Sequence, residues 1–173
     1  VVTVWALNQT NSVGQQVAAT GQSLMQSQRL AKSVSQALVG SAQAFPDVHE
    51  SADVLAKTVK GLKSGEPTLK LTQVSQALQP DVEKVIPFME RAEKNAKTVM
   101  DQQPILMQVG NALRSINRQS SDLLEIAETV ASLKLQQNAA SAEISASGQL
   151  VMLTQRIGKS ANEFLTMEGV SPE

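Results

Sequence analysis

The sequence predicts an all-α protein, in which four long helices form an antiparallel four-helix bundle and a C-terminal helix begins a second repeat. Three observations support this prediction. Apolar residues recur at three- and four-residue spacing along most of the 173 residues, as on the buried face of an amphipathic helix. Glycine and proline are few, nine and six residues, and most prolines stand between these stretches. A thirteen-residue element near the N-terminus also returns close to the C-terminus, which indicates a duplication.

The first helix is predicted over residues 8–44. Residues at a seven-residue spacing, with small or polar residues between them, form the a/d pattern of a coiled coil, and the small side chains allow another helix to approach closely. This heptad seam consists of Val17, Thr20, Leu24, Ser27, Ala31, Val34 and Leu38. The helix should end at Phe45 and Pro46, because the residue before a proline is disfavoured in the helical conformation.

The second helix is predicted over residues 48–63, with Asp47 as its N-cap and the stretch 64–67 as its end. Residues 68–79 mix two hydrophobic periods, so a short helix and an ordered loop both fit. The third helix is predicted over residues 80–100 and starts at Pro80, since a first turn tolerates proline. Pro87 lies further inside and should kink this helix.

The fourth helix is predicted over residues 105–137, antiparallel to the first. At about 1.5 Å per residue it would come level with Asn8 near Asn138, and a longer helix would have no partner within the chain. We therefore expect a turn near Asn138 and a fifth helix beyond it; the alternative is one unbroken helix that packs on another chain. The predicted domains are a first repeat over residues 1–137 and the first helix of a second, truncated repeat over residues 138–173.

Composition argues against several classes of function. Fifteen basic and sixteen acidic residues give a net charge of −1, so no broad basic surface is available for nucleic acid. The chain has no cysteine and a single histidine, which argues against zinc and iron–sulfur sites and against Ser–His catalysis. Asp47, His49, Glu50 and Asp53 are interpreted as the acidic start of a helix rather than as a metal site. We expect no enzyme activity, no metal and no cofactor.

The repeated element supplies the candidate site. Its copies span residues 21–33 and 148–160 and share seven of thirteen residues. The candidates for ligand binding or for a dimer interface are Met25, Gln28, Arg29 and Lys32, with their equivalents Met152, Gln155, Arg156 and Lys159. One interpretation is a half-buried stripe whose long stems cover apolar surface while their charged ends reach water. The other is a set of polar contacts at a helix–helix or dimer interface, which fix register or hold an anion.

This element, Gly-Gln…Met…Ser/Thr-Gln-Arg…Lys, resembles the N-terminal sensing domain of type IV pilus methyl-accepting chemotaxis transducers, the PilJ family. In that family the signature occurs twice, each time opening a helical unit. The resemblance implies the periplasmic sensor domain of an inner-membrane chemoreceptor. It also implies a homodimer that passes a stimulus to a chemotaxis-like histidine kinase pathway, here one that controls pilus extension and twitching motility.

A small-anion sensor is the alternative within sensing. The element is also similar to the ligand-facing helix of nitrate and nitrite sensor kinases, which it matches at Gly21, Met25, Gln26, Ser27, Arg29 and Leu30. The position of the arginine that holds the anion in that family is Leu24 here and Val151 in the second copy. Without that cation the main charge-assisted contact to an oxyanion is missing, so nitrate sensing is not expected.

The segment between the second and third helices is the candidate contact site for a protein partner, for example pilin. We expect it along the outer half of the bundle, away from the membrane, where irregular segments are natural contact sites. Leu69, Leu71 and Leu78 are either exposed anchors there or side chains that fold back onto the bundle. A rival from another class is a structural helical stalk or interaction module without a signalling role.

Overall fold

The computed structural model describes residues 2–166, with side chains from residue 11 onward. The elements follow in the order α1 (Val2–Leu38), α2 (Ala44–Ser64), the short 3-10 helix η1 (Pro67–Leu69), α3 (Gln79–Asp101), α4 (Gln103–Gln136) and α5 (Ser141–Thr166). The only β-type pairing in this part of the chain is an isolated bridge between Glu66 and Leu71. The all-α class predicted from the sequence is confirmed.

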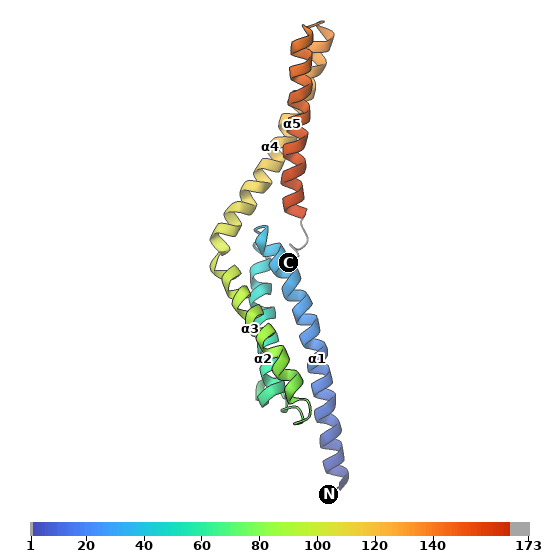
Figure 1. Ribbon diagram of the computed structural model, residues 1–173, viewed down its shortest axis with the longest axis vertical. Helices are drawn as coiled ribbons and strands as arrows, with labels where there is room; N and C mark the ends of the chain where they lie inside the picture. Colours follow the sequence, from blue (N-terminus) through green and yellow to red (C-terminus); the bar gives the residue numbers. More distant parts are fainter. Residues whose placement is uncertain (1, 167–173) are drawn as a thin grey trace.

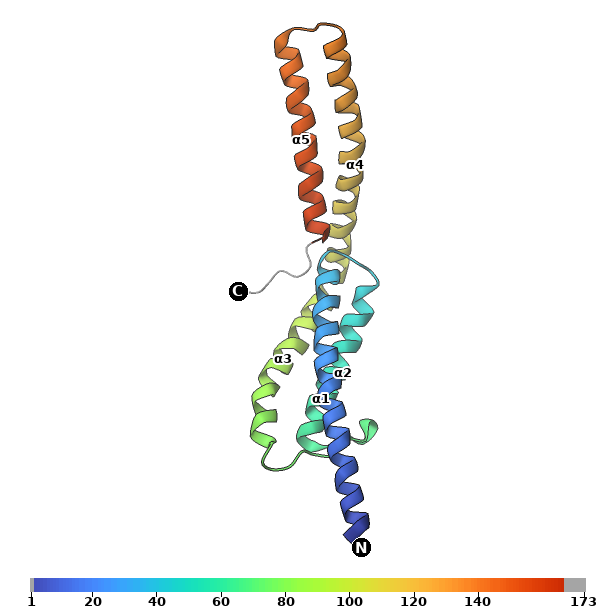
Figure 2. The same cartoon turned by 90° about the vertical axis from the view of Figure 1, so that its right-hand side faces the viewer.

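The helices form two parts that follow one another along the length of the molecule (Figures 1 and 2). In the first part α1 packs against α2 and α2 packs against α3, while α1 and α3 make few contacts. In the second part α4 and α5 form an antiparallel hairpin that extends away from the N-terminus (Figure 2). The predicted position of the fourth helix beside the first was therefore wrong, because α4 leaves the bundle and pairs with α5.

The seam between α4 and α5 explains this path. The buried side of α4 carries Ser120 and Ala127, and that of α5 carries Ser147, Thr154 and Ala161. All five side chains are small, so the two helix axes can approach closely along a heptad-spaced seam. The seam of α4 is therefore covered by α5, the other helix of the hairpin, and needs no contact with α1.

A left-handed residue closes this hairpin near the predicted position. Asn138 has φ 51°, a conformation that asparagine adopts more readily than most residues. The Ala139 N–H donates to the Lys134 carbonyl oxygen at 3.1 Å, which ends α4 with a satisfied carbonyl group. The prediction of a turn near Asn138 and of a fifth helix is confirmed.

The core of the three-helix part centres on α2. Phe45 and Val48 near its start are 1% and 0% exposed, and the apolar stripe continues through Leu55 and Val59. Met89 of α3 and Leu30 of α1 belong to the same cluster. Burial of side chains of this size stabilises a fold by about 1.5–3 kcal/mol each, so α2 is the helix that holds α1 and α3 together.

The border between α1 and α2 differs from the prediction. The first helix ends at Leu38 and not at Ala44, because Gly40 adopts a φ of 77°. Pro46 lies in the first turn of α2, where its missing N–H costs nothing. Asp47 is likewise inside this first turn and not its N-cap; the N-cap position is Gln43, whose side chain forms no capping hydrogen bond.

Residues between α2 and α3 form an ordered loop that contains η1. The carboxylate of Glu66 accepts hydrogen bonds from the hydroxyl and the backbone N–H of Thr68, at 2.7 and 3.1 Å, and these donors lower the pKa of Glu66 below its usual range. The side-chain amide of Gln16 on α1 donates to the Gln73 carbonyl oxygen at 3.1 Å. Of the two forms considered for this segment, the loop is the one found.

The third helix matches its predicted limits to within a residue. Pro87 lies inside α3, which continues through it without interruption. The helix ends at Asp101 because Pro104 cannot donate to the carbonyl group four residues before it. Within the described residues, no helix has both the length and the apolar character needed to cross a membrane.

Candidate functional site

Arg29 in the first copy of the repeated element joins α1 to α2. Its Nη2 atom lies 2.7 Å from Oδ1 of Asp47 and 3.1 Å from Oε2 of Glu50. The hydrogen bond to Asp47, followed by the charge of Glu50, raises the pKa of Arg29 above its usual range. The two carboxylates together exceed its single positive charge, so Arg29 forms a helix–helix contact within one chain and offers no free charge to a further anion.

The other candidates of the first copy are exposed. Met25 is 57% exposed, and Gln28 and Lys32 are exposed as well. Arg29 therefore takes part in the packing of α1 on α2, whereas its three companions remain on the outer surface.

In the second copy all four candidates are exposed. Lys159 lies 3.8 Å from Glu163 on its own helix, and Met152 is 50% exposed. Among the described residues, Arg156 has no counterpart of the two carboxylates that bind Arg29. The equivalent arginines thus have different surroundings, although both copies are α-helical.

The two copies also bury different faces. In α1 the face turned toward α2 includes Gln26, Leu30 and Ser33, which are 7%, 6% and 3% exposed. In α5 the equivalent residues are exposed, and the helix buries Thr154 and Ala161 instead. These correspond to Ser27 and Val34 of the heptad seam. A shift of one residue turns the buried face by about 100°, so the second copy packs through the heptad seam and the first copy does not.

The heptad seam of α1 consequently lacks a partner within the described chain over most of its length. Val17, Leu24 and Leu38 are 67%, 63% and 43% exposed. Only Val34 of the seam packs partly against the core. Three large apolar side chains at heptad spacing on one exposed face are the pattern of a helix–helix interface.

A groove of about 490 Å³ lies beside this seam, between α1 and α3. Its floor is α2, through Val59 and Leu62, and Val82 contributes to the wall formed by α3. The seam residues Val17 and Thr20 belong to the wall formed by α1. The groove occupies the place where a fourth helix would complete a four-helix bundle, since α1 and α3 both contact α2 and barely touch each other.

The candidate partner-contact residues divide into two kinds. Leu71 is 8% exposed and packs against Leu62 and Val74, so it covers the bundle. Leu69 and Leu78 are 36% and 50% exposed. Because the loop is bonded to Gln16 in the N-terminal half of α1, its predicted place along the outer half was wrong. The end farthest from the N-terminus is the turn between α4 and α5 (Figure 1).

The acidic cluster at the start of α2 is used for ion pairing. Asp47 and Glu50 bind Arg29, and Asp53 pairs with Lys57 at 2.8 Å. Among the described residues, no group of three potential metal ligands of the His, Cys, Asp or Glu type comes together.

A family model described as the N-terminal region of type IV pili methyl-accepting chemotaxis transducers, PilJ, matches residues 5–115. This is more than half of the 173 residues. The chain belongs to the PilJ family. The PilJ match covers the first copy of the repeated element, all of α2 and α3, and the beginning of α4. The comparison with curated proteins gives no match.

PilJ membership connects the chain with chemotaxis signalling and type IV pili, as the repeated element had predicted. Sequence reasoning missed two parts of the site. The groove wall formed by α3 was not singled out, although Val82 and Val85 carry the periodic apolar signal of a packing face. The pairing of Arg29 with the start of α2 was also missed, because it depends on how two helices align around the Gly40 turn.

Proposed function

We propose that this chain is the extracytoplasmic sensor domain of a methyl-accepting receptor for a type IV pilus chemotaxis-like pathway. It lies in the periplasm, and the receptor passes the stimulus across the inner membrane to a kinase pathway that controls twitching motility. The observation that carries this proposal is the PilJ family match, which spans nearly all of the three-helix part.

The domain acts as a homodimer through the heptad seam of α1. Its exposed apolar residues, among them Val17 and Leu24, need cover from another helix, and Val17 also lines the groove between α1 and α3. Between residue 11 and Leu38 the only charged residues of α1 are Arg29 and Lys32, neither of which belongs to the seam. An uncharged seam can face a second copy of itself without like-charge repulsion.

The duplication supports the same use of the seam. In α5 the equivalent residues Ser147, Thr154 and Ala161 are buried against α4. The repeated helix is therefore suited to close packing through this face, and in α1 the partner is the second protomer. A shift of one α1 past the other then transmits the stimulus, and the small seam residues Thr20, Ser27 and Ala31, which lie between the large ones, leave room for this movement.

The stimulus is a contact with another protein, of which pilin is the example. Leu69 and Leu78 support this proposal as exposed apolar residues on the loop between α2 and α3. Leu71 is not among the contact residues, since it is buried.

The experiment uses cells that make the intact transducer. Val17→Glu and Leu24→Glu place a charge on the heptad seam, and Ala18→Glu places the same charge on the neighbouring exposed face as a matched control. We expect the seam variants to lose the twitching response and the control to keep it, with equal amounts of receptor in the membrane fraction. A normal response from both seam variants would refute the proposal.

A further inference from the structure

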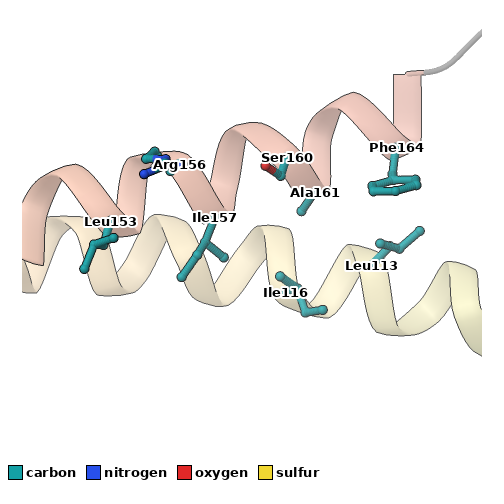
Figure 3. A pocket seen from close by; sticks show the side chains of 8 residues that line it. All are labelled: Leu113, Ile116, Leu153, Arg156, Ile157, Ser160, Ala161 and Phe164. Carbon is teal, nitrogen blue, oxygen red and sulfur yellow. The ribbon is translucent and has the colours of Figure 1, made fainter.

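A second exposed apolar surface lies on α5, beside α4. Leu153, Ile157 and Phe164 of α5 are 50%, 50% and 58% exposed. With Leu113 and Ile116 of α4 they line a groove of about 490 Å³. Figure 3 shows Phe164 facing Leu113 at one end of this groove, with Ile157 extending from α5 toward α4.

The repeat indicates what such a surface does. Leu153, Ile157 and Ser160 are the equivalents of Gln26, Leu30 and Ser33, and in the first copy these three residues are buried in the packing of α1 on α2. The surface of α5 that lies open is therefore the one that α2 covers on α1.

The charges lead to the same conclusion. Arg156 lines the groove and is the equivalent of Arg29, which binds Asp47 at 2.7 Å and Glu50 at 3.1 Å from the first turns of α2. In the first copy, α2 thus covers the apolar stripe of α1 and its two carboxylates bind the arginine beside that stripe. The charge complementary to Arg156 is a pair of carboxylates three residues apart.

We propose that the groove on α5 is the seat of an acidic amphipathic helix of the α2 type. The apolar stripe of that helix covers Leu153 and Ile157, and two carboxylates in its first turns bind Arg156. The inference rests on the duplication and not on the signalling role. In the first copy the acidic helix follows the repeated element directly, so its source here is the corresponding helix of a complete second repeat.

The test uses the whole 173-residue chain and, as the probe, a fluorescent synthetic peptide with the sequence of residues 42–64. Fluorescence anisotropy measures binding to the wild type, to Arg156→Glu and to Arg118→Glu, a matched charge reversal at an exposed arginine of α4 outside the groove. A second peptide carries Asp47→Lys and Glu50→Lys. Circular dichroism checks that the three proteins are equally helical.

We expect saturable binding of the first peptide, weakened about tenfold by Arg156→Glu through loss of two ion pairs and unchanged by Arg118→Glu. The lysine peptide should prefer the Arg156→Glu protein to the wild type. Binding that is absent up to about 1 mM peptide, or that Arg156→Glu leaves unchanged, would overturn the proposal. If Arg156→Glu instead dissociates a dimer of the chain alone in sedimentation, the occupant is a second copy and the proposal is also overturned.

Discussion

The contact between the two parts of the molecule depends on two glycines that face each other. Gly40, in the turn after α1, and Gly110, in α4, approach so closely that a Cβ on Gly110 would lie 2.4 Å from the Val39 carbonyl oxygen and 2.8 Å from the Gly40 Cα. Arg114 supports the contact with a hydrogen bond of 3.3 Å from its Nη2 atom to the Gly40 carbonyl oxygen. The substitution Gly110→Ala tests whether this close contact between Gly40 and Gly110 exists.

The expected magnitude follows from two opposing terms. Alanine in the interior of a helix is favoured over glycine by about 1 kcal/mol. Overpacking typically costs about 1–3 kcal/mol, and the upper end applies here because the atoms struck belong to the backbone and cannot rotate away. The free energy of unfolding should therefore fall by about 2 kcal/mol in Gly110→Ala.

Gly148 provides the matched control, since a Cβ there meets nothing within 4 Å. Gly148→Ala should raise the free energy of unfolding by up to about 1 kcal/mol. Urea unfolding followed by far-UV circular dichroism measures both variants, and small-angle X-ray scattering detects any opening between the two parts. The reasoning is refuted if Gly110→Ala is as stable as Gly148→Ala and leaves the scattering profile unchanged.

Three further predictions concern the three-helix part. Phe45→Ala should lower the free energy of unfolding by about 3–5 kcal/mol, measured by urea unfolding, because Phe45 is 1% exposed in the core; a change below about 1 kcal/mol would contradict this core assignment. Arg29→Gln should lower the urea midpoint, because it removes the ion pairs to α2, whereas Arg156→Gln should leave it unchanged; equal midpoints for the two variants would contradict the difference in surroundings. Because the hydrogen bonds from Thr68 lower the pKa of Glu66 in the folded protein, the ionised carboxylate stabilises the fold. This stabilisation is fully present above pH 4.5, the ordinary pKa of Glu66, and is lost as the pH falls through the lower pKa of the folded state. The protection factor of the Leu71 amide, which pairs with Glu66 at 2.9 Å, should therefore fall in acid, and Thr68→Val should weaken this dependence; a Leu71 protection factor that stays constant into acid would contradict it.

Most helix limits were predictable because each depends on local signals. The turn at Asn138 was placed by matching the length of the fourth helix to that of the first; α4 does not lie beside α1, but the turn is found there and contains the left-handed residue that ends α4. The end of α1 was misplaced by six residues because Pro46 was given more weight than Gly40. A proline is tolerated in a first turn, so the glycine with positive φ is the stronger signal of the border.

The arrangement of the helices was less predictable. The heptad pattern of α1 identifies a helix-packing face but not its partner, and α1 turns a different face, with Leu30, toward α2. The path of α4 depends on the close contact of Gly40 with Gly110 and on small residues shared with α5. Both are contacts between segments that lie far apart in the sequence. The spacing of apolar residues along one helix does not show which distant helix it contacts.

The sequence allowed us to predict that the candidate site lies on two equivalent helices. It did not allow us to predict which side chains surround the candidate residues of each helix. The repeated element correctly led to the PilJ family. It could not distinguish Arg29, which binds two carboxylates, from Arg156, whose surroundings are open, because the difference lies in the helix that packs beside each of them.

The central claim is that the heptad seam of α1 is the dimer interface of a PilJ-family sensor. Because the chain contains no cysteine, Leu24→Cys introduces a single thiol in the middle of the seam, and Gln22→Cys introduces one on another exposed face. In membranes that contain the intact transducer with any cysteines outside this chain replaced, oxidation should cross-link Leu24→Cys into a disulfide-bonded dimer, since only facing residues come within the roughly 4–7 Å between Cα atoms that a disulfide spans. Cross-linking of Gln22→Cys in place of Leu24→Cys, or of neither variant, would contradict the claim.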